Sequence, residues 1–333
     1  MNSLERYMGV VRGEAVDIVP RIPILMQYAA EYIGSNYACF ASDYRVLVEA
    51  NYRCAVDFDF DQLSAISDNC RETSGFGGEI EYLEDATPRC TAPLAETKDL
   101  SVLEKPDPYT SEHMLDQVTA VKEYKKRFDG QYSIMGWIEG PAAEAGDVRG
   151  INNFLMDIVD DEPFLCELMD ICLEVGIAFA RAQVEAGADT IGIGDAIASQ
   201  VSPDMYERLI QPREKKLVQA IFDMGALVKL HICGNITHLL PGIADLPIAI
   251  IDVDHMVDII SVRKALPDTV VISGNIDPVS GILQGNPVTI REKVLRDYMS
   301  VGNPYMVNAG CEIPSKTPVE NLEALCKPIP YEK

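Results

Sequence analysis

Two short cysteine-containing runs carry the strongest chemical signal in this sequence, His231–Asn235 and Asn308–Glu312. Each follows an apolar stretch that is typical of a β-strand, and side chains at positions i and i+2 of a strand share one face. We therefore expect His231 and Cys233 to point the same way, with Cys311 as a third ligand to the same ion. One imidazole and two thiolates suit Zn²⁺, and three protein ligands leave a fourth position open for chemistry.

The predicted ligand set indicates a particular kind of reaction. Coordination to a metal removes the proton of a thiol, so a substrate thiol at the fourth position would become a thiolate nucleophile at neutral pH. A neighbouring carboxylate, Asp195 or Glu312, could hold the resting metal or accept that proton. The fourth ligand stays open among Asp195, Asp254, Glu312 and water. Cysteine is also often a small buried hydrophobe, but loops at strand ends more often carry function.

Further polar residues follow other strand-like runs, and we expect them to face the same pocket. The predicted catalytic carboxylates are Asp68, Asp195 and Glu312, and the predicted cofactor-binding residues are Trp137, Glu139, Asn235 and Asn275. Trp137 is equally consistent with a packed aromatic residue or a wall of the pocket. The run Asp252–His255 is interpreted as an ordinary polar rim, and His113 and His238 as satisfied or solvated imidazoles on helices.

Strand-like and helical patterns alternate along most of the chain, which predicts the elements that must position these residues. The expected strands are Arg21–Gln27, Gln62–Ser67, Tyr132–Glu139, Thr190–Ala196, Leu227–Cys233, Ala249–Val253, Thr269–Ser273 and Tyr305–Gly310. Amphipathic stretches between them include Pro163–Ala186, Pro203–Met224 and Pro287–Ser300. Eight such units predict an α/β fold, a (β/α)8 TIM barrel, with an open doubly wound sheet as the competitor.

Two regions depart from the simple alternation. The first twenty residues are expected to form a helix that caps one end of the barrel. The segment between Asp68 and Tyr132 contains a glycine-rich loop (Gly75–Gly78), a hairpin signal and a helix, which predicts insertions at the barrel mouth.

Composition limits the class of protein. The 333 residues, of which 24% are charged and 47% hydrophobic, are typical of one folded barrel domain over residues 1–333. A formal net charge of −24 argues against nucleic acid and anionic membrane surfaces as partners. Nine widely spaced cysteines and an amino terminus without an apolar signal core predict a reducing, cytoplasmic location.

The chain resembles the uroporphyrinogen decarboxylase superfamily over nearly its full length. Within it, the chain is most similar to the zinc-dependent, corrinoid-linked branch that includes the methylcobamide:coenzyme M methyltransferases. The matching runs are Arg12–Pro20, Ser67-Asp68, Gly136–Gly140, Leu230–Asn235, Gly274–Asp277, Asn308–Pro314 and Thr317–Asn321. The zinc ligands of that branch, an H-x-C run and a distant cysteine, match His231, Cys233 and Cys311.

The resemblance implies a (β/α)8 barrel and methyl transfer, with Zn²⁺ and a corrinoid (methylcobalamin) that a corrinoid-binding partner protein carries. The most favoured reaction gives the methyl group to a small thiol. The reverse half-reaction, in which a methyl ether gives its methyl group to cobalt(I), stays open, and so does a carrier without turnover. The decarboxylase branch is disfavoured, because its arginine-rich stretch corresponds to Pro23–Glu31, which contains no arginine. Asp68 matches both branches and does not separate them.

Overall fold

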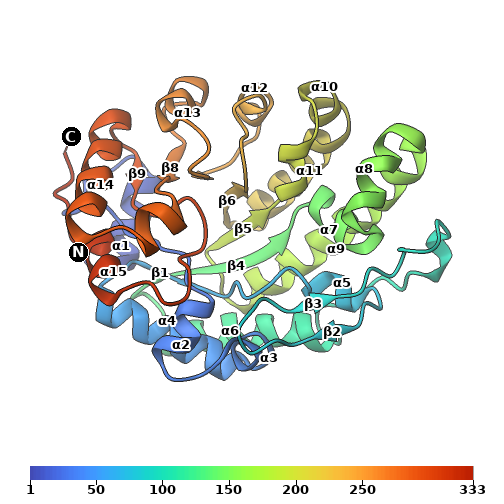
Figure 1. Cartoon of the computed structure of the whole chain (residues 1–333), viewed down its shortest axis with the longest axis horizontal. Helices are drawn as coiled ribbons and strands as arrows, with labels where there is room; N and C mark the ends of the chain where they lie inside the picture. The colour runs from blue at the N-terminus through green and yellow to red at the C-terminus, as the bar shows by residue number, and fades with distance from the viewer. Residues whose placement is uncertain (333) are drawn as a thin grey trace.

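A curled parallel sheet forms the centre of the protein in the computed structural model, which describes residues 1–332 (Figure 1). Its strands are β1 (Gln62–Ser64), β4 (Ser133–Glu139), β5 (Thr190–Gly194), β6 (Leu227–Ile232), β7 (Ile250–Val253), β8 (Val271–Gly274) and β9 (Tyr305–Met306). They pair in this order, each parallel to the next. The predicted α/β barrel is confirmed, with seven regular strands among the described residues.

The gap between β1 and β9 is closed by an irregular segment, and the expected strand over Arg21–Gln27 is wrong. Asp61 N donates to Arg21 O (2.8 Å) on one side, and Ile22 N donates to Val307 O (2.9 Å) on the other. Pro20 and Pro23 offer no amide hydrogen, so a continuous ladder cannot form here. Residues 20–24 therefore occupy the position of the eighth barrel strand without forming a regular strand.

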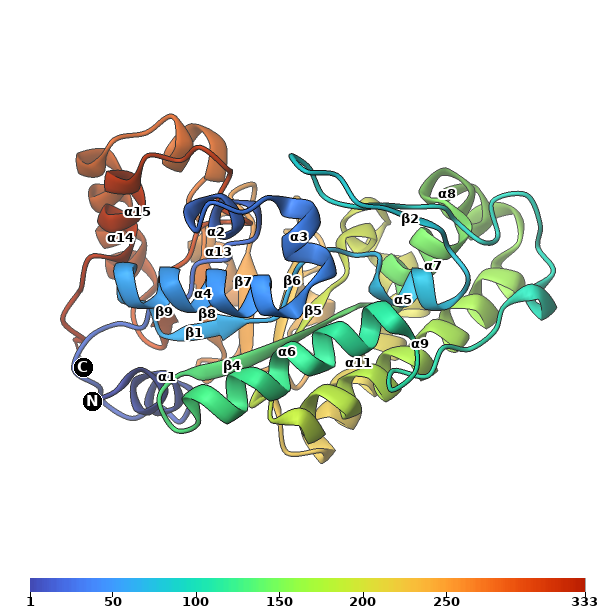
Figure 2. The same ribbon diagram turned by 90° about the horizontal axis from the view of Figure 1, so that it is seen from below.

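Helices cover the outside of the sheet and line its rim. They are α1 (Ser3–Val11), α2 (Gln27–Tyr32), α3 (Tyr37–Ser42), α4 (Tyr44–Phe58), α5 (Arg71–Gly75), α6 (Glu112–Phe128), α7 (Pro141–Arg149), α8 (Ile151–Asp160), α9 (Glu162–Ala186), α10 (Pro203–Met205), α11 (Gln211–Asp223), α12 (Leu240–Ile243), α13 (Ile259–Ala265), α14 (Pro287–Val301) and α15 (Val319–Cys326). The helices α4 and α6 lie against β1 and β4 (Figure 2). The expected long helix Pro163–Ala186 is confirmed as α9, which ends at Gly187 in the left-handed region (φ 119°).

The helix α1 closes the end of the barrel opposite the strand carboxyl ends. Tyr7 and Val10 pack against Ile250, Val271 and Met306, which project into the barrel from their strands. The Tyr7 hydroxyl lies 3.1 Å from Thr190 Oγ1. The expected cap is confirmed, although the helix ends at Val11 rather than near residue 20.

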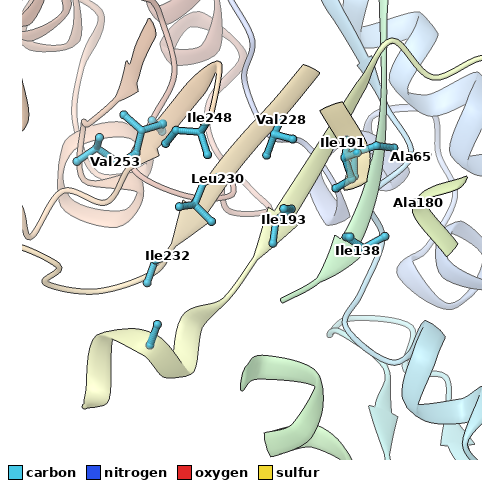
Figure 3. Close-up of a cluster of buried hydrophobic side chains, with 14 of the residues drawn as sticks. Ala65, Ile138, Ala180, Ile191, Ile193, Val228, Leu230, Ile232, Ile248 and Val253 are labelled. Atoms are coloured by element: carbon cyan, nitrogen blue, oxygen red, sulfur yellow. The ribbon is translucent and has the colours of Figure 1, made fainter. Parts of the chain in front are cut away.

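Strand alternation decides which side chains enter the barrel. Val228, Leu230 and Ile232 of β6 belong to the apolar core outside the sheet (Figure 3). The intervening Lys229 and His231 are buried and polar, and successive side chains of a strand point to opposite faces. The inner face of β6 is therefore the face that carries chemistry.

The segment between β1 and β4 adds α5, the short hairpin of β2 (Ile80–Glu81) and β3 (Arg89–Cys90), and α6. The expected hairpin is confirmed, with Ile80 opposite Cys90. None of the described helices has the length and apolarity needed to cross a bilayer.

Candidate metal centre

The three predicted ligands converge at the carboxyl ends of the strands. His231 is the fifth residue of β6, Cys233 follows that strand directly, and Cys311 lies in the loop after β9. His231 Nε2 lies 3.0 Å from Cys233 Sγ, and the two sulfur atoms are 3.8 Å apart. One ligand atom from each residue lies within 4.8 Å of the others. The side chains therefore meet although 78 residues separate the two cysteines.

The spacing of these atoms fits a tetrahedral zinc site. Zinc binds thiolate sulfur at about 2.3 Å, so two such ligands at a tetrahedral angle lie about 3.8 Å apart. The observed Sγ–Sγ distance has this value. A nitrogen at about 2.0 Å would lie about 3.5 Å from each sulfur, so the imidazole would have to move outward by about 0.5 Å. This fit is geometric, and metal binding itself remains a prediction.

The imidazole of His231 is oriented from the neighbouring strand. Asp252 stands opposite His231 in the β6–β7 register, and its Oδ2 lies 3.1 Å from His231 Nδ1. Asn308 Nδ2 donates to the other carboxylate oxygen of Asp252 (2.8 Å), and the buried Lys229 Nζ lies 3.7 Å from it. A carboxylate behind a histidine sets the tautomer and direction of a metal ligand. The interpretation of Asp252 as an ordinary rim residue is therefore wrong, and its place on the strand after β6 is the sequence signal for a partner of His231.

Cys311 is held in place by a close backbone approach. Gly310 N donates to Ile276 O (2.7 Å), and a Cβ on Gly310 would lie 2.5 Å from His255 N. No side chain fits there, so glycine at this position lets the loop bring Cys311 toward β6. Gly234, after Cys233, is fixed similarly by its amide, which donates to Asp254 Oδ2 (2.9 Å).

The three candidate ligands shift one another's pKa values. A hydrogen bond with Cys233 lowers the pKa of Cys311 to about 4, while the same contact raises the pKa of Cys233. Burial opposes protonation of His231, but the charges of Cys233 and Asp252 outweigh it and raise the pKa of His231. Binding of a divalent cation to these side chains would displace their protons into solvent.

A cavity of about 190 Å³ opens beside the three ligands. The rest of its lining consists of apolar side chains and carboxyl groups from the opposite strands and loops, together with small residues at strand ends. They are Ile24, Met26, Ile66, Asp68, Asn69, Thr87, Trp137, Glu139, Gly194, Ala196 and Glu312. The structure thus brings Asp68, Trp137, Glu139 and Glu312 together with the three predicted metal ligands.

Glu312 enters the cavity beside Cys311. Its Oε1 accepts a hydrogen bond from Gln27 N (3.0 Å), at the start of α2. Burial raises the pKa of Glu312 to about 7. Of the three carboxylates proposed as the fourth ligand, Glu312 is the one that lines this cavity.

Asp68 is held as a carboxylate by a set of donors. His113 Nε2 lies 3.0 Å from its Oδ1, and Cys70 N donates to the same oxygen (2.8 Å). Burial opposes ionisation, but His113 and Arg71 outweigh it and lower the pKa of Asp68. We expected His113 to be a satisfied imidazole on a helix, and the structure places it on α6 behind Asp68.

Glu139 is partly buried at the end of β4, beside the buried acids Glu72 and Glu144. Its Oε1 accepts from Trp137 Nε1 (2.9 Å), and its amide donates to Glu72 Oε1 (3.0 Å). Thr73 Oγ1 donates to Glu144 Oε1 (2.8 Å). Burial raises the pKa of Glu72 to about 8 and the pKa values of Glu139 and Glu144 well above their ordinary range.

Three predicted site residues lie outside the cavity lining. The Asp195 carboxylate turns to the start of α7, where it accepts from Ala143 N (2.8 Å), so its expected place beside the metal is corrected. It follows β5 as predicted, but the unpaired amides of a helix N-terminus attract its charge. Burial raises the pKa of Asp195 to about 7.

Asn235 and Asn275 are also separate from the cavity. Asn235 is exposed, and its Oδ1 accepts from Thr237 N (3.0 Å) in a tight turn. Asn275 is buried, and its Nδ2 donates to Val257 O (2.6 Å). Each amide therefore serves the local backbone, and the expectation that they line the pocket with Trp137 and Glu139 is corrected. Asp254, another candidate fourth ligand, accepts from the amide of Gly234 and does not line the cavity.

The fold and site together describe a (β/α)8 barrel with a candidate metal centre at its mouth. The family model of uroporphyrinogen decarboxylase (URO-D) matches residues 2–329, so the chain belongs to this family.

Relatives of two kinds match this chain. The methylcobamide:CoM methyltransferase MtbA of Methanosarcina mazei is 31% identical over 208 residues, which is 62% of this chain and 60% of that protein. The uroporphyrinogen decarboxylase of Prochlorococcus marinus (strain MIT 9312) is 27% identical over 275 residues, which is 80% of this chain and 78% of that protein. The chain thus spans about 60% of the length of the methyltransferase relatives that it matches.

A solved structure described as a methyltransferase from Methanosarcina mazei superposes with a TM-score of 0.85. It is 22% identical in sequence and covers 98% of this chain and 97% of its own. At this identity the likeness supports the barrel fold alone.

Proposed function

We propose that this protein transfers a methyl group between a protein-bound corrinoid and a small-molecule thiol, with Zn²⁺ held by His231, Cys233 and Cys311. The observation that carries the proposal is the meeting of one imidazole and two thiols within 4.8 Å beside a cavity at the strand ends. Zinc with three protein ligands retains one position for a reacting group. The relatives named methylcobamide:CoM methyltransferases support the same reaction class.

The chemistry divides between the metal and the residues of the chain. Bound zinc would supply a Lewis acid that lets a thiol lose its proton at neutral pH. Asp252 and Asn308 fix the His231 ring so that Nε2 faces the two sulfurs. Trp137 and the apolar side chains Ile24 and Ile66 limit the water around the reacting atoms.

The atoms of the transfer balance without a further reactant. The cobalt–carbon bond of the methylated corrinoid breaks and leaves both electrons on cobalt, while a carbon–sulfur bond forms to the acceptor. The thiol proton passes to a carboxylate of the cavity, for which Asp68 and Glu312 are placed. A corrinoid-binding protein would present the methyl group at the mouth of the barrel.

Metal content and methyl transfer test the proposal in parallel. We expect about one zinc per chain, and loss of zinc and of methylcobalamin-dependent thiol methylation in Cys233→Ala and Cys311→Ala. Cys172→Ala is the matched control, because Cys172 is a buried thiol on α9 and does not line the cavity. Equal zinc content in all three variants would overturn the assigned ligands.

Decarboxylation of a porphyrinogen is a second candidate function. It is favoured by relatives named uroporphyrinogen decarboxylase, one of which, from Microcystis aeruginosa, matches 94% of this chain. Such activity would need no metal and would persist in Cys311→Ala. Corrinoid spectra distinguish two further alternatives. Methylation of cobalt(I) by a methyl ether would show the reverse methyl transfer. A spectrum that changes on binding, but shows no methyl transfer with any donor or acceptor, would show a carrier without turnover.

A further inference from the structure

The wall of the cavity opposite the candidate metal ligands is rich in acidic side chains. Three carboxyl groups line it, from Asp68, Glu139 and Glu312. Among the described residues that line it, none is lysine or arginine. Two cations lie nearby, and neither lines the cavity. Arg71 Nε lies 3.9 Å from Asp68 Oδ2, so Arg71 and His113 already pair with the Asp68 carboxylate. Arg71 donates to Ser67 Oγ (2.7 Å) and Ala41 O (3.3 Å), and Lys229 is buried beneath His231 against Asp252.

Glu139 presents one carboxyl oxygen to this space. Its Oε1 is engaged by the indole N–H of Trp137 (2.9 Å). Its Oε2 has no hydrogen-bond partner among the described residues, and a Cβ on Gly194 would stand 3.2 Å from it. Because Gly194 also lines the cavity, the absent side chain leaves room beside Oε2. That oxygen is available to a ligand that carries a hydrogen-bond donor.

The aromatic wall adds a second preference for positive charge. Trp137 lines the cavity, and its ring centroid lies 6.4 Å from that of His231. The face of an indole ring is electron-rich and attracts ammonium and quaternary ammonium groups. Apolar neighbours, Ile24 and Ile66, reduce the screening by water. An aromatic face beside carboxylates is a setting in which a small organic cation is stabilised.

We propose that the small molecule that exchanges its methyl group here is an organic cation, with its ammonium group held between Trp137 and the carboxyl group of Glu139. This inference rests on the proposed function, because it names the substrate class of the same site. The cavity volume of about 190 Å³ corresponds to about six water-sized groups, so the molecule is small. A sulfonate or carboxylate on the same thiol would meet like charge instead.

Three two-carbon thiols that differ only in their terminal group test the charge preference. They are 2-aminoethanethiol (cationic), 2-mercaptoethanol (neutral) and 2-mercaptoethanesulfonate (anionic), each offered to the zinc-loaded protein with methylcobalamin. We expect kcat/KM to fall in that order, by about tenfold or more from the first to the third. Equal or better use of the sulfonate would overturn the inference.

Thioether binding removes the differences in acidity between these thiols. The S-methyl forms of the aminothiol and of the sulfonate have no thiol proton, and calorimetry on the zinc-loaded protein measures their affinities directly. Tighter binding of the ammonium form supports the inference even if no thiol is methylated, and tighter binding of the sulfonate form overturns it. Methylation of no thiol, with zinc bound, would count against the proposed acceptor instead.

Two substitutions locate the preference in the cavity wall. Met26→Lys places a cation in the lining and should move selectivity toward the sulfonate by about tenfold. Glu139→Gln keeps the size of the side chain and should weaken binding of the ammonium thioether more than that of the neutral one. Glu167→Gln, at an exposed position on α9, is the control. Unchanged ratios in both wall variants would contradict the assignment.

Discussion

The two sides of the barrel mouth differ in how their ionisable side chains are stabilised. On the β6–β9 side, the imidazole of His231 meets two thiols, and the carboxylate behind it meets Asn308 and Lys229. On the β4 side, the buried Glu72 and Glu144 lie near the partly buried Glu139, and the pKa values of all three are raised. On the first side each charged group has a complementary partner, whereas on the second side burial is the main cause of the raised pKa values. The candidate metal ligands therefore face a wall whose carboxyl groups can respond to the charge of a ligand.

Substitution of Asp252, on the β6–β9 side, should have the largest effect on stability and on zinc affinity. Asp252→Asn leaves the buried Lys229 without its counter-charge and His231 without its orienting carboxylate. We expect a loss of about 3 kcal/mol in unfolding free energy and a 10- to 100-fold (about one to two decades) weaker zinc affinity. Denaturant unfolding and competition with a zinc chelator measure the two quantities. Asp268→Asn, at an exposed position after α13, is the control, and a similar zinc affinity in both variants would contradict the role of Asp252.

On the β4 side, removal of the Glu72 carboxyl group should increase the unfolding free energy of the protein at alkaline pH. Burial raises the pKa of Glu72 from its ordinary value of 4.5 to about 8, so the folded protein binds a proton more tightly than the unfolded chain. Stability from this group is fully present below pH 4.5 and declines as pH rises toward 8. Glu72→Gln should remove this decline and gain about 2 kcal/mol at pH 8 relative to the wild type. Unfolding free energies at pH 5 and pH 8 measure it, and a parallel loss at both values would show that the carboxyl group is ionised in the fold.

The contact between Asp68 and His113 provides the mildest test. His113 is among the groups that lower the pKa of Asp68, so His113→Gln should raise that pKa and move the acid limb of the kcat/KM profile to higher pH. We expect a shift of about one pH unit with little change in stability. His238→Gln is the control, because His238 Nε2 contacts Val201 O on another part of the mouth. An acid limb that stays in place would limit Asp68 to a structural role.

The barrel and the three candidate ligands could be predicted from local patterns, whereas their surroundings could not. An H-x-C run at the end of an apolar strand places His231 and Cys233 on one side by alternation alone. The partner of His231 depends on the register between β6 and β7, which no local pattern specifies. Asp195 follows β5 directly, as Cys233 follows β6, but the Asp195 carboxylate accepts a hydrogen bond from the N-terminus of α7 instead of facing the cavity. The segment after Pro20 is as apolar as a strand, and only its prolines indicate that it cannot pair like one.

The meeting of Cys233 and Cys311 also has a consequence for assembly of the chain. An ion held there would fasten the sixth strand to the carboxyl-terminal loop and enclose β7, β8 and β9 within a loop of 78 residues. It would act as a reversible cross-link that restricts the unfolded chain, in the manner of a disulfide but governed by metal supply. The stability of the segment between residues 233 and 311 would then depend on the supply of the ion.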